Sequence, residues 1–164
     1  MKIQRFQQGS VLIFSLMLLI MLTIIAVAQM TMNTPQTRIA SNSADRQVAF
    51  HTAEGALNEA INNLMSGQYS TASFLSNTNG LYLFNPNNAP IWTTIDWSSA
   101  SSSIKSFQGG SNAQSSYIIE QLPSIIQGGQ NINSPANVYR ITARGVGASG
   151  GSVVILQSTV QIQQ

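Results

Sequence analysis

The chain has 164 residues, of which only 7 % are charged, against roughly 25 % in ordinary soluble domains. Lys2 and Arg5 precede the first apolar segment, and the rest of the chain has no excess of either charge. The scarcity of clustered Lys and Arg argues against a nucleic-acid-binding protein, which needs them to neutralise phosphates. The absence of cysteine excludes a disulfide scaffold, a thiolate metal site and a cysteine nucleophile.

An apolar segment occupies residues 11–28 (VLIFSLMLLIMLTIIAVA), and Ser15 and Thr23 are its polar members. About 20 such residues in a helix span the hydrocarbon core of a bilayer and satisfy every backbone group internally. The basic residues Lys2 and Arg5 predict a cytoplasmic N-terminus, with the rest of the chain across the membrane.

Three interpretations of the apolar segment remain open. Ala26-Val27-Ala28 before Gln29 has the small-x-small form of a secretory cleavage site, so the segment fits a cleaved signal peptide. It also fits a plain signal anchor. In the third interpretation the cut falls earlier, between Gly9 and Ser10, and the apolar segment is retained.

The sequence after the apolar segment predicts an amphipathic helix, because apolar residues recur at three- and four-residue steps. The residues expected on its buried face are Ala49, Phe50, Ala53, Ala56, Leu57, Ala60, Ile61, Leu64 and Met65. Gly67 offers a stop for this helix, and Pro35 is expected to kink or interrupt it near the membrane. His51 and Glu54 predict a surface pair rather than a metal site, because the chain has a single histidine.

Residues 67–115 are rich in Ser, Asn and Thr and predict a long loop region. Trp92 and Trp97 within it are expected to pin the loop onto the domain by burying apolar area. A ligand platform built on these two tryptophans stays open as an alternative. Asp96 is the region's single acidic residue, so a carboxylate pair of the glycosidase kind is absent there.

The remaining residues predict strands at 116–122, ended by Pro123, at 137–144 and at 153–162. Alternation in the second strand places Tyr139, Ile141 and Ala143 toward the core. These elements indicate an α+β fold with a three- or four-stranded antiparallel sheet, closed by a hairpin and covered on one face by the helix.

On the outer face of this sheet, Arg140 and Arg144 are expected to be solvated and to pair with Glu120 across the strands. Their alternative role is to bind an anion. No spacing in the sequence indicates a nucleophile elbow, a phosphate loop or a metal signature, so catalytic, cofactor and metal residues are not predicted.

Several segments, in their order along the chain, resemble the PilX-type minor pilins of type IV pili. They are residues 8–12, Asn42 with 45–50 and 53–57, Trp92 with 96–97, 117–120, 139–145 and 156–158. The resemblance implies a pilin-like fold, in which a long hydrophobic helix packs on a small antiparallel sheet. It also implies a division into a leader (1–9), a transmembrane helix (10–32), an exposed amphipathic helix (33–66), a polar loop region (67–115) and the sheet (116–164).

The resemblance further implies a minor pilin that primes pilus assembly and lies at the fibre tip, not an enzyme. Prepilin peptidase would cut between Gly9 and Ser10, and Ser10 would be methylated. The implied partners are other minor pilins, the major pilin and inner-membrane lipid, without nucleic acid, cofactor, metal or small-molecule substrate. The protein would cross the bacterial inner membrane once, with a periplasmic C-terminal domain. The helix residues implied in assembly are Phe14, Asp45, Arg46, Phe50 and Glu54.

Phe14 departs from the pattern of major pilins, which carry glutamate at this fifth mature position. That glutamate is understood to pair with the terminal amine of the subunit ahead, and a carboxylate without such a partner is costly in a hydrophobic bundle. Phe14 therefore fits a subunit at the tip. Two alternatives stay open: a minor pseudopilin of type II secretion, whose family generally has a larger inserted domain, and a secreted or periplasmic ligand-binding domain with a cleaved signal peptide.

Overall fold

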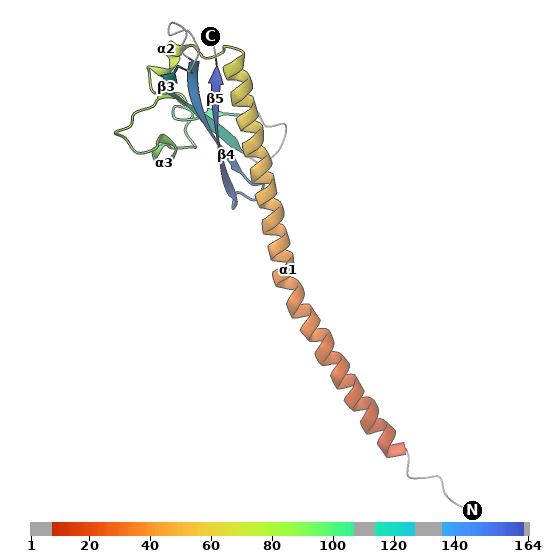
Figure 1. Ribbon diagram of the computed structural model, residues 1–164. Coiled ribbons are helices and arrows are strands. Elements are labelled where there is room, and N and C mark those ends of the chain that lie inside the picture. Colours follow the sequence, from red (N-terminus) through yellow and green to blue (C-terminus); the bar gives the residue numbers. More distant parts are fainter. Residues whose placement is uncertain (1–7, 107–113, 127–135, 163–164) are drawn as a thin grey trace, which may run out of the picture. The chain divides into compact units, whose positions relative to one another are not determined.

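The computed structural model describes residues 8–106, 114–126 and 136–162. The chain divides into two compact units, Met1–Asn42 and Ser43–Gln164, called here the N-terminal and C-terminal units. One helix, α1 (Gln8–Met65), contributes to both (Figure 1). The C-terminal unit continues with α2 (Thr71–Phe74), β1 (Leu81–Leu83), α3 (Ile91–Thr94), β2 (Ile104–Lys105), β3 (Ser115–Ile125), β4 (Ala136–Val146) and β5 (Val153–Ile162).

Helix α1 passes through Pro35 without ending there. Proline removes one backbone hydrogen bond from a helix, but the loss of a single bond is compatible with helical residues on both sides. Of the two effects expected of Pro35, the interruption is therefore wrong, and the kink stays a prediction. The stop at Gly67 is confirmed, because Gly67 has a positive φ of 76° and its N–H donates to the carbonyl of Leu64 at 3.2 Å.

The C-terminal unit contains a five-stranded sheet in which β1, β3, β4 and β5 lie in that order, and β2 also pairs with β3. The α+β prediction and the β4–β5 hairpin are confirmed. The sheet is mixed rather than antiparallel, because β1 runs parallel to β3. Pro123 does not end β3 as expected. The strand continues past it across a register shift between Leu122 and Ile125, and such irregularities are where a strand tolerates proline.

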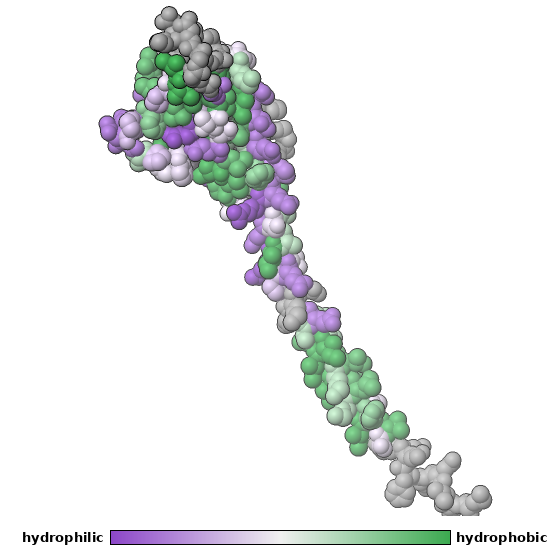
Figure 2. All heavy atoms as spheres, in the orientation of Figure 1, coloured by the Kyte–Doolittle hydropathy of each residue, from purple (hydrophilic) through white to green (hydrophobic). Residues whose placement is uncertain are grey.

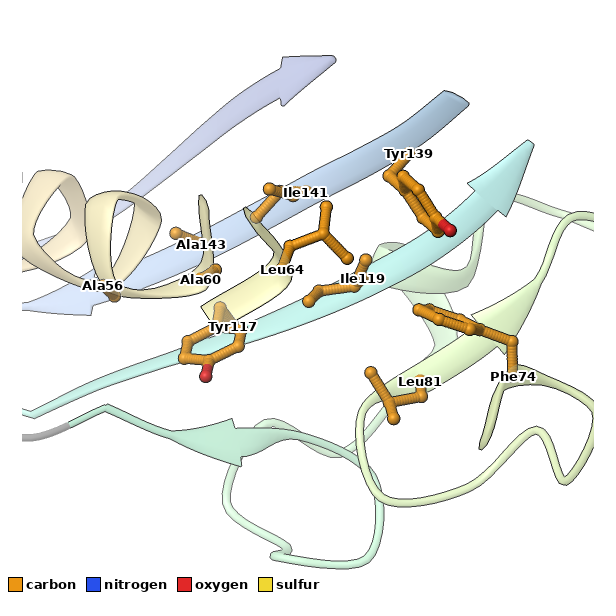
Figure 3. Close-up of a cluster of buried hydrophobic side chains, with 10 residues drawn as sticks. All are labelled: Ala56, Ala60, Leu64, Phe74, Leu81, Tyr117, Ile119, Tyr139, Ile141 and Ala143. Carbon is orange, nitrogen blue, oxygen red and sulfur yellow. The ribbon is translucent and has the colours of Figure 1, made fainter. Parts of the chain in front are cut away.

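The core lies between α1 and one face of the sheet. Ala49, Ala53, Ala56 and Ala60 are fully buried along the helix, and Leu64 continues the same face. Figure 3 shows the cluster that this face joins, which consists of Ala56, Ala60, Leu64, Phe74, Leu81, Tyr117, Ile119, Tyr139, Ile141 and Ala143. The predicted inward set of β4 is thus confirmed, and the alanines let the helix approach the strands closely.

Two residues expected on the buried face of α1 are exposed. The side chain of Phe50 is 44 % exposed and that of Met65 is 68 % exposed. Alanines at positions 49, 53, 56 and 60 already fill the contact with the sheet, so a larger residue one position away points outward. An apolar residue at the correct spacing is therefore insufficient to place it in the core.

The region 67–115 contains more structure than the sequence predicts. It contributes α2, β1, α3 and β2 to the C-terminal unit. β1 and β2 both pair with β3, and Phe74 of α2 is fully buried against Tyr139 with ring centroids 5.4 Å apart. The polar composition of this region hides these contacts.

Candidate functional site: the apolar helix and the contact of α1 with the β4–β5 hairpin

The apolar part of α1 presents a continuous hydrophobic surface within the N-terminal unit. Figure 2 shows this part of the helix as a hydrophobic stretch, and by length and composition it is sufficient to cross a membrane. Ser15 donates its hydroxyl to the carbonyl of Leu12 at 2.9 Å, and Thr23 donates to the carbonyl of Ile20 at 2.8 Å. Both polar side chains are thus satisfied inside the helix, as lipid or a dry helix bundle requires.

The residues implied in processing and packing lie at the start of this helix. Gly9 and Ser10 are within its first turn, because α1 begins at Gln8. The side chain of Phe14 is 72 % exposed in the isolated chain. The sequence between Arg5 and Arg38 contains no charged residue. A partner that covers Phe14 would therefore meet an entirely uncharged helix surface.

Asp45 connects α1 to the turn of the β4–β5 hairpin. Its carboxylate accepts hydrogen bonds from the backbone N–H and the hydroxyl of Ser149, both at 2.8 Å, and from the N–H of Ser152 at 3.2 Å. These bonds, led by the Ser149 N–H, lower the pKa of Asp45 from 3.8 to about 2. Asp45 is charged at neutral pH, and these bonds hold the hairpin of its own chain against α1. We call this contact the hairpin latch.

Two glycines allow the hairpin to reach the helix. A Cβ added to Gly147 would lie within 2.6 Å of all three atoms of the Asp45 carboxylate group. A Cβ added to Gly145 would lie 2.1 Å from the carbonyl oxygen of Ala49 and 2.5 Å from the backbone nitrogen of Ala53. Gly145 meets helix backbone atoms, so this position admits only glycine unless the backbone moves, whereas a side chain at Gly147 would push the Asp45 carboxylate out of its bonds with the hairpin.

The outer face of α1 in the C-terminal unit carries the other implied assembly residues. Arg46, Phe50 and Glu54 are all exposed. His51 Nδ1 lies 3.5 Å from Glu54 Oε2 on the surface, which confirms the predicted pair. The Phe50 ring contacts His51 edge-on, with centroids 5.8 Å apart. Among the residues that the structure describes, no cluster of His, Asp and Glu forms a metal site.

Glu120 and Arg140 pair across β3 and β4, as the sequence predicts. Arg140 Nε donates to Glu120 Oε2 at 2.8 Å and Arg140 Nη2 donates to Oε1 at 3.0 Å, while the guanidinium lies over the Phe84 ring. The expected solvated setting is wrong for this pair, because Glu120 is only 3 % exposed. A bidentate, buried pair of this kind holds the two strands in register and is not available to bind an anion.

The two tryptophans are half-buried within their loop. Trp97 Nε1 donates to the carbonyl of Trp92 at 3.2 Å, and the Trp97 carbonyl accepts a bond from Lys105 Nζ at 2.6 Å. Because Lys105 belongs to β2, this bond fastens the loop to the sheet. The geometry fits the loop-pinning role better than a free aromatic platform.

A buried polar cluster near the end of α1 was not anticipated from the sequence. The Tyr117 hydroxyl lies 2.9 Å from the Tyr69 hydroxyl and accepts a bond from Asn63 Nδ2 at 3.1 Å. Burial raises the pKa of Tyr117, so its hydroxyl stays protonated and connects helix to strand. This cluster, like Ser149 and Ser152 of the hairpin latch, is formed by residues distant in sequence, and local patterns do not reveal it.

Comparison with known proteins identifies the family. The family model for the type IV pilus assembly protein PilX C-term matches residues 31–162, which include the hairpin latch and every strand of the sheet. No curated protein and no solved structure matches the chain significantly. The match extends over most of the chain, and the chain therefore belongs to the PilX family of type IV pilus assembly proteins.

Proposed function

We propose that this protein is a minor pilin that helps to prime type IV pilus assembly and lies at the fibre tip. Its family supports involvement in pilus assembly and partners among the other pilus components. This family is structural rather than enzymatic. The observation that carries the proposal is the uncharged apolar helix surface with Phe14 at the fifth position after Gly9.

The chemistry of Phe14 supports a tip position. A carboxylate at this position would need a cation from the subunit ahead of it, because burial of an unpaired charge in a bundle of apolar helices costs several kcal/mol. Phe14 needs no such partner. A subunit with nothing ahead of it therefore loses nothing by having phenylalanine in place of glutamate, whereas a subunit in the shaft of the fibre would lose its ion pair.

The proposal includes a mature chain that starts at Ser10 and keeps the apolar helix in the inner membrane. Prepilin peptidase would cut after Gly9, the terminal amine of Ser10 would be methylated, and Lys2 and Arg5 would stay in the cytoplasm. In this arrangement, the exposed Arg46, Phe50 and Glu54 are available to neighbouring pilins. Asp45 acts indirectly, because its carboxylate holds the hairpin latch.

Deletion of the gene and labelling of the fibres test this function. We expect the deletion strain to assemble few surface pili and the wild-type gene to restore them. An antibody against the chain should label one end of each sheared fibre. Normal piliation without the gene would refute the priming role, and label along the whole fibre would refute the tip position.

The Phe14→Glu and Phe14→Leu variants separate the charge of this position from its bulk. If the chain lies at the tip, Phe14→Glu should restore fewer pili than Phe14→Leu, because the new carboxylate has no cation to pair with. Equal piliation by the two variants at equal amounts of chain would contradict the argument from Phe14.

A further inference from the structure

Strand β5 forms one edge of the sheet. All ten residues of Val153–Ile162 pair with β4 in an unbroken antiparallel register. Among the described residues, no strand pairs with the other side of β5. Between Val153 and Val160, that side therefore presents a row of backbone donors and acceptors, which we call the β5 edge.

The β5 edge lacks the features with which proteins usually protect such edges. Natural edge strands are shortened, bulged, or carry charged residues and proline. β5 has ten residues, no bulge, no charged residue and no proline. Its outward face includes Val153 and Ile155, which are 47 % and 42 % exposed. The strand is thus suited to accept another strand rather than to repel one.

The hydrogen bonds of β4 determine which N–H groups of β5 point to the free side. Val146 N–H donates to Gln114 on the β3 side at 2.8 Å, and Gly147 N–H donates to Ser152 on the β5 side at 2.8 Å. Residues alternate along an antiparallel ladder, so the residues paired with Val146, Arg144, Thr142 and Arg140 make no backbone hydrogen bonds to β4. On β5 these are Val153, Ile155, Gln157 and Thr159, whose N–H groups therefore face the β5 edge.

We propose that the β5 edge accepts an extended segment of a different pilus subunit as an added strand. The inference rests on the proposed function, because membership of a pilus assembly family makes other pilus components the partners. Strand addition supplies affinity through backbone hydrogen bonds and specificity through alternate side chains. The added segment should be uncharged, with apolar residues where it passes Val153 and Ile155.

A second copy of this chain is a poorer occupant. Two β5 edges related by a two-fold axis pair antiparallel, so the Ser43 ends of the two α1 segments would point in opposite directions. Chains anchored in one membrane by the apolar residues before Ser43 present these ends to the same side. The partner strand therefore comes from a different subunit.

A proline substitution in β5 tests the proposal, with alanine at the same position as its matched control. Thr159 is exposed, pairs with Arg140 and has its N–H on the free side. Thr159→Pro removes this donor and places a proline ring on the β5 edge, while the backbone hydrogen bonds between β5 and β4 are unaffected. Thr159→Ala loses the same side chain and keeps the N–H. We expect roughly tenfold fewer surface pili with Thr159→Pro and wild-type numbers with Thr159→Ala, at equal amounts of chain.

Hydrogen exchange of the full chain gives a direct readout of the edge. The chain is measured alone in detergent micelles and in complex with the other pilus subunits extracted from the same cells. The amides of Ile155, Gln157 and Thr159 should exchange at least roughly tenfold more slowly in the complex. The amides of Val154 and Leu156, which face β4, should be protected in both samples and also in the Thr159→Pro variant, which shows that the variant folds.

Each other outcome overturns the inference. Equally fast exchange in both samples would mean that no strand adds. Slow exchange in the isolated monomer would mean that the chain covers its own edge, and slow exchange only in an isolated dimer would make a second copy the occupant. Full piliation by Thr159→Pro in a strain that needs the gene would reject the β5 inference and leave the proposed function intact. Normal piliation without the gene would reject the function itself.

Discussion

The contact of Gly145 with α1 allows a sharp test of how the helix is held on the sheet. In Gly145→Ala the new Cβ would lie 2.1 Å from the Ala49 carbonyl oxygen and 2.5 Å from both the Ala53 nitrogen and the Thr52 hydroxyl. Two of these three atoms belong to the helix backbone, which cannot rotate away as a side chain can. The helix and β4 must therefore separate by about an ångström, a gap that forfeits much of the dispersion attraction across the contact.

The expected cost follows from this geometry. Overpacking of a well-packed core costs about 1–3 kcal/mol, and a clash with helix backbone belongs at the upper end of that range. For a folded unit of this size, such a loss should lower Tm by roughly 10 °C. Thermal unfolding of the full chain in detergent micelles, followed by near-ultraviolet circular dichroism of Trp92 and Trp97, measures this change within the C-terminal unit.

Gly55→Ala is the matched control, because it makes the same substitution on the exposed side of the same helix. No heavy atom lies within 4 Å of a Cβ added at Gly55. Alanine is favoured over glycine in a helix by about 1 kcal/mol, so Gly55→Ala should raise Tm by a few degrees. A Tm for Gly145→Ala equal to or above that of the wild type would refute the close contact between β4 and α1.

Three further predictions use the same full chain in detergent, and the first concerns Asp45. Because the pKa of Asp45 is lowered from 3.8 to about 2, its carboxylate stabilises the fold above about pH 4, and this contribution is lost as the pH falls through 2. The difference in Tm between the wild type and Asp45→Asn should therefore shrink over that interval. A constant difference would contradict the hairpin latch. Arg140→Met leaves the buried Glu120 carboxylate unpaired and should lower the free energy of unfolding by about 3–5 kcal/mol, as measured by chemical denaturation. The double variant Arg140→Met with Glu120→Leu should recover most of this loss. A double variant as unstable as the single one would argue against the buried pair. Phe50→Ser should change the free energy of unfolding by at most about 0.5 kcal/mol, since Phe50 lies on the surface. The same variant should reduce the number of pili if this face of α1 meets other pilins. A large loss of stability would place Phe50 in the core.

Local sequence patterns predicted the helix and the strand in which buried residues recur at a regular spacing. The helix face from Ala49 to Leu64 follows from three- and four-residue spacing, and the inward residues of β4 follow from alternation. The Glu120–Arg140 pair was predictable because opposite charges on neighbouring strands pair when the register allows it. Its burial was not, since the residues that surround it come from other parts of the chain.

The remaining features depend on contacts between distant segments. β1 and β2 have three and two residues and lie in a polar region, so only their pairing with β3 defines them. Gly145 and Gly147 lie in a glycine-rich part of the sequence, and only the structure shows that they let the hairpin approach α1 closely. The sequence placed Asp45 in a family motif, but its bonds to Ser149 and Ser152 across more than 100 residues are visible only in the fold.

The mass of the mature protein tests most directly whether the apolar helix is kept. The chain should be purified from membranes and from sheared pili, and its N-terminus identified by mass spectrometry. We expect a chain that begins at Ser10, carries a methyl group on its terminal amine and contains residues 11–28. A soluble protein that begins at Gln29 would contradict the proposed pilin, because the helix surface on which its assembly depends would be gone.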